Sequence, residues 1–244
     1  MNPALTLATT RRILTQLRHD PRTVAMLIVV PTLLMVLLRF VFNSPVVFSH
    51  IAPALLGVFP FLIMFIIASI TTLRERTTAT LERLMTLPIG RLDLLFGYAL
   101  AFGTLAVLQV ALAAGVSLAW LGLDLAGSAV MLLLIAVLDA LLGMALGLFV
   151  SAFARTEFQA VQFMPVFVLP QILLCGLFVP RGDMGWLLRW LSDVMPLSYA
   201  VEALGRVTTS ATIDAVILRN LAVVACCALL ALVLGAATLR RRTP

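Results

Sequence analysis

The chain has 244 residues, of which 62% are apolar and only 11% are charged, and its mean hydropathy is +1.13. Soluble domains carry roughly 25% charged residues, so this composition excludes a disordered protein, a disulfide-linked secreted domain and nearly all soluble enzymes. We therefore expect an all-α integral membrane protein that forms a single domain over residues 1–244.

The basic residues restrict the function classes further. All 17 of them are arginine, and because a phosphate-binding P-loop needs a lysine, the chain cannot hold an ATPase site of that kind. His19 and His50 are too few for a histidine-built metal centre, and the three cysteines lack metal or disulfide spacing. We expect no catalytic residue, no cofactor and no metal on this chain.

The first predicted element covers residues 4–19, within the N-terminal segment 1–23. Its apolar residues recur at helical spacing and arginines flank them, which is typical of a helix lying on a membrane surface. A disordered basic tail is the alternative. The apolar arc consists of Leu7, Ile13, Leu14 and Leu17, with Arg11 and Arg18 beside it.

Six apolar stretches follow, each long enough to cross a bilayer, which takes about 20 residues per helix. Short cytoplasmic loops collect positive charge, and 12 of the arginines lie in the N-terminal segment, the second and fourth connections or the C-terminal tail. We therefore expect both chain ends in the cytoplasm. The arginines would face anionic lipid headgroups, so we expect membrane lipids and no nucleic acid as partners. The predicted spans are residues 24–42, 51–73, 94–120, 127–151, 158–179 and 216–239.

The connection after the second span is the most informative polar stretch. Residues 73–88 place apolar and charged side chains on opposite sides of a helix, and Pro88 stops that helix before the next span. We predict a short cytoplasmic helix over residues 76–86 that docks into a groove on a partner; an ordinary solvated loop is the alternative. The apolar edge is Leu81, Leu84 and Met85, and the charged edge is Glu75, Arg76, Glu82 and Arg83.

The predicted span over residues 127–151 contains a stripe of small residues and an acid. The stripe recurs every four residues, a spacing that lets two helices approach closely, within one chain or between subunits. Asp139 lies near mid-membrane, where a carboxylate is costly unless it faces a partner or water. Its role stays open: an interhelical hydrogen bond to Gln109 or Gln171, or instead a place in a substrate path through these three side chains or a role linked to a proton. The stripe is Gly143, Gly147 and Ser151.

The fifth span and the connection after it are irregular. Pro165 and Pro170 interrupt the span, and two apolar segments within residues 180–215 are too short to cross the bilayer. We predict that these segments, residues 185–191 and 196–205, are re-entrant helices on the outer side; a flat amphipathic connector is the alternative. The residues assigned to this outer segment are Trp186, Trp190, Pro196, Tyr199, Glu202 and Arg206.

Three of these stretches resemble the bacterial ABC-2-type transporter permeases, and most of all the membrane subunit of daunorubicin/doxorubicin-type drug exporters. Residues 73–88 resemble the family's glutamate-rich signature, although Ala79 stands where the family has Gly and Thr77 where it often has an acid. Residues 156–180 resemble its proline-rich fifth span. Residues 196–206 are similar to its segment with the same spacing of Pro, Tyr, Glu and Arg.

The resemblance implies a division of labour with another polypeptide. An ATP-binding subunit, present in two copies, would hold ATP and Mg²⁺ and dock on a coupling helix at residues 76–86. A second permease, identical or a paralogue, would complete a type V ABC exporter for a drug, antibiotic or lipid in a bacterial cytoplasmic membrane. Residues 1–23 would be the connecting helix, residues 24–179 the first five spans, and residues 216–244 the last span with its cytoplasmic tail.

Two other functions fit the residues alone. Asp139 would let the chain work as a proton-coupled secondary transporter, although no internal repeat of the kind common in such carriers is evident. A membrane anchor or sensor that recruits a soluble partner is the third function. Transport that depends on a separate ATPase would distinguish the exporter from both.

Overall fold

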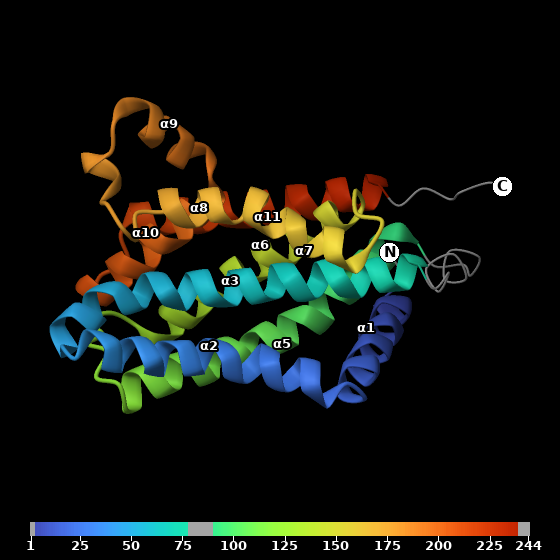
Figure 1. Ribbon diagram of the computed structural model, residues 1–244, viewed down its shortest axis with the longest axis horizontal. Helices are drawn as coiled ribbons and strands as arrows, with labels where there is room; N and C mark the ends of the chain where they lie inside the picture. The colour runs from blue at the N-terminus through green and yellow to red at the C-terminus, as the bar shows by residue number, and fades with distance from the viewer. Residues whose placement is uncertain (1–2, 78–89, 239–244) are drawn as a thin grey trace.

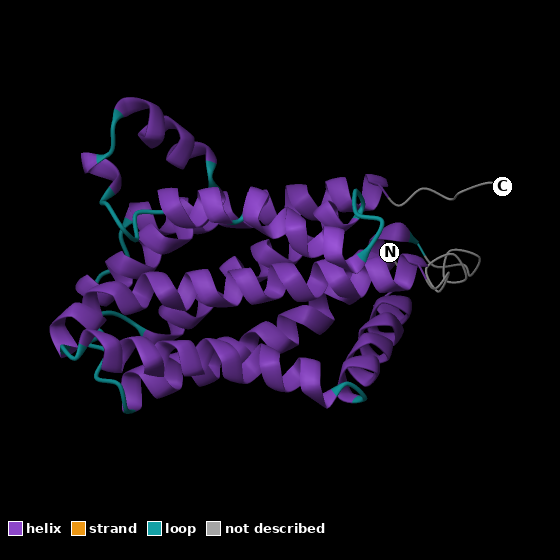
Figure 2. Cartoon of the chain, viewed as in Figure 1, coloured by secondary structure: helices purple, strands orange, loops and turns teal. Residues whose placement is uncertain are grey.

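The computed structural model describes residues 3–77 and 90–238, and these ranges are helical without a strand (Figures 1 and 2). The prediction of an all-α chain is confirmed. The helices are α1 (Pro3–Arg18), α2 (Pro21–Phe42), α3 (Pro45–Thr77), α5 (Arg91–Ala119), α6 (Ala129–Ser151), α7 (Glu157–Phe167), α8 (Leu169–Leu174), the 3₁₀ turn η1 (Arg181–Asp183), α9 (Trp186–Val194), α10 (Pro196–Thr209) and α11 (Ala215–Thr238).

Six segments are long and apolar enough to cross a membrane, as predicted. The second span starts earlier than the prediction because Pro45 opens a helix that continues to Thr77. At 1.5 Å per residue the 33 residues of α3 extend roughly 50 Å, well beyond a hydrocarbon core of about 30 Å. The candidate spans are Pro21–Phe42, Pro45–Glu75, Asp93–Ala119, Ala129–Ser151, Glu157–Leu174 and Ala215–Thr238.

The spans run along the long axis of the molecule and define two ends (Figure 1). The α1 end holds α1 together with the C-terminal ends of α3 and α11. The α9 end holds α9, α10 and the connection between α2 and α3. Both ends of the described chain therefore lie at the α1 end; the side of the membrane that this end faces stays a prediction.

The contact between α3 and α6 forms the centre of the bundle. Gly143 and Gly147 of α6 lie against the backbone of α3, where a Cβ at either glycine would collide with the carbonyl oxygen of Phe61 or Phe65. Small residues permit this approach of two backbones. The stripe of small residues is therefore used inside the chain, and Ser151 bonds its own helix through the Leu148 carbonyl at 2.7 Å.

The fifth span is broken, as its prolines predict. Helices α7 and α8 meet at Val168, with Pro165 inside α7 and Pro170 in the first turn of α8. Because proline has no N–H to donate, the hydrogen-bond ladder is interrupted on both sides of the joint. Helix α8 ends at Leu174, earlier than the predicted span, and Gly176 turns the chain away with a φ of 96°, which glycine adopts without strain.

The two short segments between the fifth and sixth spans are both helices, as predicted, and they differ in burial. Helix α10 packs on α3, α6 and α11, and its last carbonyls, on Val207 and Thr208, accept hydrogen bonds at 3.0 Å from the N–H groups of Gly127 and Ala126. Helix α9 stands apart from the bundle and exposes its tryptophans (Figure 1). Re-entry of these helices into a bilayer stays a prediction.

The predicted coupling helix over residues 76–86 falls mostly outside the described ranges. Of its residues, the backbone of Arg76 belongs to the last turn of α3. Its docking role stays a prediction. The residues assigned to the coupling contact that lie outside the described ranges are Leu81, Glu82, Arg83, Leu84 and Met85.

Candidate functional site

An ion pair ties α1 to the end of α3, immediately before the predicted coupling segment. Arg12 Nη1 lies 3.2 Å from Glu75 Oε1, and the Tyr98 hydroxyl of α5 donates a hydrogen bond to Glu75 Oε2. Glu75 was predicted on the charged edge of the coupling helix, but its carboxylate faces the bundle interior and is only 6% exposed. The reason is that α3 continues without a break, so residue 75 shares the inward face of Ser69 and Thr72.

Helix α1 docks on α5 through hydroxyl groups as well as apolar side chains. Thr6 donates to Asp93 Oδ1 at 3.4 Å and Thr10 to the Gly97 carbonyl at 3.3 Å. Gly97 allows this approach, since a Cβ there would come within 2.6 Å of α1. The buried face is rotated from the predicted arc, and Leu7 is 63% exposed, because the threonines rather than Leu7 turn toward α5. The buried residues of α1 are Thr6, Thr9, Ile13 and Leu17.

Asp139 is fully buried in α6, and within the described residues neither of its carboxylate oxygens has a hydrogen-bond partner. Room for it comes from Gly57 of α3, where a Cβ would lie 3.2 Å from Asp139 Oδ2. The predicted bonds to Gln109 and Gln171 are absent. Gln109 is also buried without a partner among the described residues, whereas Gln171 donates to the Phe167 carbonyl at 2.9 Å within the broken fifth span. A substrate path through these side chains stays a prediction.

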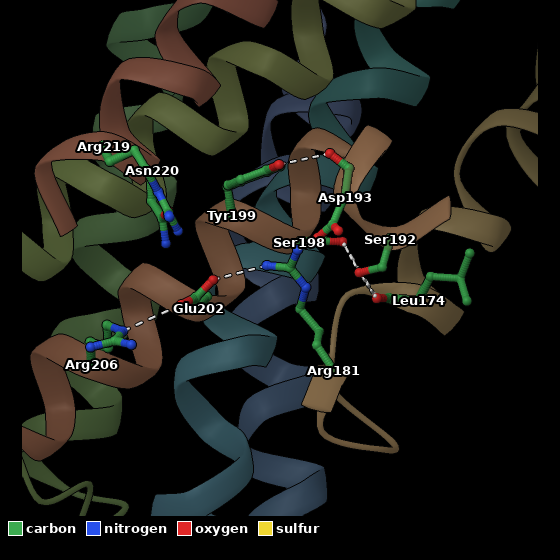
Figure 3. Close-up of polar contacts among 10 residues, drawn as sticks. All are labelled: Leu174, Arg181, Ser192, Asp193, Ser198, Tyr199, Glu202, Arg206, Arg219 and Asn220. Carbon is green, nitrogen blue, oxygen red and sulfur yellow. Dashed lines mark hydrogen bonds and ion pairs between the residues drawn. The ribbon is translucent and has the colours of Figure 1, made fainter. Parts of the chain in front are cut away.

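A chain of alternating charges joins η1, α9, α10 and the start of α11 at the α9 end, and Figure 3 shows its members from Asp193 to Arg206. Arg181 pairs with Asp193 and, at 2.9 Å, with Glu202. Glu202 also lies 3.4 Å from Arg206, which in turn pairs with Asp214 at 2.9 Å. Exposed ion pairs contribute about 1 kcal/mol or less each. Their main effect here is to fix the relative positions of the four segments.

A cation–π contact and hydroxyl hydrogen bonds also hold α9 and Arg181 in place within this network. The Tyr199 ring lies under the Arg181 guanidinium, 5.2 Å from centroid to Cζ, and its hydroxyl donates to a backbone carbonyl of α9 at 2.7 Å. The Ser192 hydroxyl donates to the Leu174 carbonyl at 2.7 Å and lies 3.1 Å from the Ser198 hydroxyl (Figure 3). The C-terminal half of α9 is therefore anchored to both α8 and α10.

Two acids cap spans at their N-termini and have lowered pKa values. The Ile217 N–H donates to Asp214 Oδ1 at 2.9 Å, and this bond, together with the charge of Arg206, lowers the pKa of Asp214. The Thr23 hydroxyl and N–H donate to Asp20 at 2.6 Å and 3.2 Å and lower the pKa of Asp20 in the same way. Both acids are therefore ionised at neutral pH, where they complement the positive N-terminal ends of α11 and α2.

A pocket of about 610 Å³ opens at the α9 end, between α3, α9, α10, α11 and the connection after α8. This volume lies in the range of sites that hold small organic molecules. Burial raises the pKa of the Cys175 thiol in its lining to about 11, so this thiol stays neutral at neutral pH. The charged lining residues are Arg181, Arg189, Asp193, Glu202 and Arg219, and the apolar ones include Ile51, Ala54, Leu177 and Val201.

Of the residues predicted for the outer segment, Glu202 lines this pocket. Tyr199, Glu202 and Arg206 belong to the charge network, and Pro196 occupies the first turn of α10. The tryptophans at positions 186 and 190 lie on α9 and are exposed. Arg181 and Asp193 were not predicted as site residues, because Arg181 lies 21 residues from Glu202 and 12 from Asp193 and such separations give no periodic signal.

Comparison with known proteins identifies the family. The ABC-2 type transporter family model matches residues 4–207, which confirms the resemblance found in the polar stretches. The chain belongs to the ABC-2 type transporter family. It thus shares its family with membrane subunits of ATP-binding-cassette transporters.

Individual relatives of this ABC-2 type chain carry transporter names. "Probable multidrug ABC transporter permease YbhS" of Escherichia coli strain K12 is 28% identical over 184 residues, which cover 75% of this chain and 49% of the relative. "ABC transporter G family member 20" of Dictyostelium discoideum is 23% identical over 156 residues, or 64% of this chain and 21% of the relative. The chain therefore spans about half the length of the first of these relatives, or less.

Proposed function

We propose that this ABC-2 type chain is the permease of an exporter that moves an amphipathic or lipophilic molecule out across a bacterial cytoplasmic membrane. The α1 end would face the cytoplasm and the α9 end the outside. The family match, the six candidate spans and the excess of arginines in the sequence segments predicted to be cytoplasmic support this proposal.

The observation that carries the proposal is the junction at the end of α3. Residues 76–86, directly after Glu75, would form the coupling helix on an ATP-binding subunit, which would hold ATP and Mg²⁺. Displacement of this segment would reach α1 through Arg12 and α5 through Tyr98. Because α3 is one helix of 33 residues packed backbone to backbone on α6, the displacement would also reach the opposite end of the bundle.

The working exporter would contain two ATP-binding subunits and two permeases, the second permease being identical or a paralogue. The permease would supply the path and no catalytic group. A substrate path at the interface of the two permeases follows from this arrangement.

The coupling assignment is tested with Glu82→Lys in vesicles that contain both subunits. We expect the variant to insert and fold, while ATP hydrolysis no longer drives export. Asp183→Lys is the matched control, because it makes the same charge change at the α9 end. Unchanged export by the Glu82 variant would overturn the assignment.

The unpartnered carboxyl of Asp139 favours a second function, a proton-coupled secondary transporter. The two functions differ in their energy source. Export that stops when the ATP-binding subunit is removed but survives a protonophore supports the ATP-driven exporter. Export that survives removal of that subunit, and is lost in Asp139→Asn or with a protonophore, would establish the secondary transporter.

A further inference from the structure

Three arginines line the pocket at the α9 end, and they differ in how their charge is compensated. Arg181 is paired with Asp193 and Glu202. Arg189 of α9 and Arg219 of α11 line the same pocket, and within residues 3–77 and 90–238 neither forms an ion pair. The pocket therefore presents two guanidinium groups whose charge no carboxylate balances.

The two acids in the pocket lining already form ion pairs with arginines. Asp193 and Glu202 both bind Arg181, and Glu202 also lies 3.4 Å from Arg206. A cationic ligand would have to displace Arg181 to reach either carboxylate. An anionic ligand would meet guanidinium groups that need no such exchange. The arrangement of charges thus favours an anion over a cation.

The structure also restrains one of the free arginines. Arg219 donates from Nε and Nη2 to Asn220 Oδ1 at 3.3 Å and 3.1 Å, and Asn220 is fully buried (Figure 3). This anchor uses one edge of the guanidinium and leaves Nη1 for a ligand. A side chain held in place loses less conformational entropy on binding, which favours affinity.

The pocket lining has an apolar part as well as a charged one. Ile51, Ala54, Leu177 and Val201 contribute to its lining beside the charged residues. Covering this apolar surface stabilises a ligand by about 25 cal/mol per Å² buried. A ligand with an acyl chain or ring attached to its charged group satisfies both parts of the lining.

We propose that this pocket binds an amphiphile with an anionic, phosphate-type headgroup, and that Arg189 and Arg219 are the residues that bind this headgroup. The inference rests on the proposed function in one respect: it makes anionic amphiphiles the cargo class of the exporter. Binding itself needs the permease alone, and it can be measured without an ATP-binding subunit.

The test uses the purified full chain in an uncharged detergent. The probes are dihexanoyl phosphatidic acid, dihexanoyl phosphatidylcholine, dodecyltrimethylammonium and inorganic phosphate. In α9, Trp186 precedes Arg189 by three residues and Trp190 follows it directly, so we use tryptophan fluorescence to follow binding. We expect phosphatidic acid to bind about tenfold more tightly than each of the other probes, because the other probes lack either the anionic headgroup or the apolar body.

Variants of Arg189 and Arg219 test whether the lipid binds in this pocket. The double variant Arg189→Gln/Arg219→Gln should weaken the binding of phosphatidic acid about tenfold or more, as expected when charged hydrogen bonds are lost. Arg11→Gln/Arg18→Gln is the matched control, because both arginines are exposed on α1 at the opposite end and form no ion pair within the described residues. We expect this control to bind like the wild type.

A variant that fills the pocket provides independent support. Gly205 lines the pocket, and a Cβ at this position meets nothing within 4 Å. Gly205→Phe should therefore occupy the pocket without a backbone clash and abolish binding, with an unchanged melting temperature. Gly115→Phe on α5, where a Cβ also meets nothing within 4 Å, should leave binding unchanged.

Several results would overturn the proposal. These are wild-type affinity for phosphatidic acid in the double arginine variant, equal affinity for phosphatidylcholine or the cation, or inorganic phosphate binding as tightly as the lipid, which would indicate a site for free anions. Arginine-dependent lipid binding without ATP-driven transport would leave the pocket assigned and count against the exporter. ATP-driven transport without such binding would support the exporter and overturn the assignment of the pocket.

Discussion

Gly143 of α6 lies against the backbone carbonyl oxygen of Phe61 on α3, with no room between them for a Cβ. Gly147 repeats this relationship with Phe65 one turn further along the pair. The two candidate spans with the largest buried share, α3 and α6, are thus joined backbone to backbone. This contact controls how rigidly the two helices move together.

Replacing Gly143 with alanine should therefore destabilise the fold. Overpacking of this kind costs about 1–3 kcal/mol, which outweighs the gain of about 1 kcal/mol that alanine brings to a helix. Gly115→Ala is the control, since its added methyl group meets nothing within 4 Å. Unfolding in mixed micelles by increasing SDS measures both variants; equal stability of the two would contradict the close approach.

The pair Arg12–Glu75 should contribute to stability as a unit. Glu75→Ala leaves a largely enclosed guanidinium and should cost about 2–3 kcal/mol, less than the roughly 3–5 kcal/mol for fully buried pairs because the Arg12 side chain is 25% exposed. The double variant with Arg12→Ala should cost less than the sum of the single variants. Additive costs in this cycle would show that the two side chains act independently.

The pair Arg74–Glu157, at the same end of the molecule, should behave differently. Its side chains are 57% and 51% exposed, although Nε and Oε1 lie only 2.7 Å apart. Solvent screening limits such pairs to about 1 kcal/mol or less. We expect Glu157→Gln to change the unfolding midpoint little, and the small effect to vanish at 1 M salt. A cost as large as that of Glu75→Ala would refute this ranking.

Asp214 should contribute a pH-dependent part of the stability. Its pKa is lowered in the folded state, first by the Ile217 N–H and then by Arg206. The stabilisation is therefore present above the unfolded value of about 3.9 and is lost as the pH falls through the lower folded pKa. Asp214→Asn keeps an acceptor for the cap but removes the charge, so stability measured between pH 3 and pH 7 should depend less on pH. An unaltered acid profile would exclude Asp214 as the source.

The sequence predicted the features that depend on local composition. The number of spans follows from the length of the apolar runs, the break in the fifth span from Pro165 and Pro170, and a close helix approach from the spacing of Gly143 and Gly147, although the spacing did not identify α3 as the partner. Each of these signals lies within one helix or its immediate flanks.

Contacts between distant residues were not predictable in the same way. Arg181 finds its partners on α9 and α10 only because the turn after α8 brings the three segments together. A bond from Asp139 to Gln109 or Gln171 was one of the roles left open, but the broken fifth span directs the Gln171 amide to its own backbone. Glu75 was placed on a surface because the loop was thought to start at residue 74, whereas α3 continues to Thr77.

The bonds from Ala126 and Gly127 to the last carbonyls of α10 have a mechanical consequence. They clamp the α5–α6 connection to α10, so neither can swing without the other. Among the residues that the structure describes, no such bond ties the N-terminal half of α9 to the bundle, whereas its C-terminal half is anchored through Ser192 and Asp193. Opening of the pocket at the α9 end would therefore proceed by a tilt of α9, while α10 and the α5–α6 connection keep their positions.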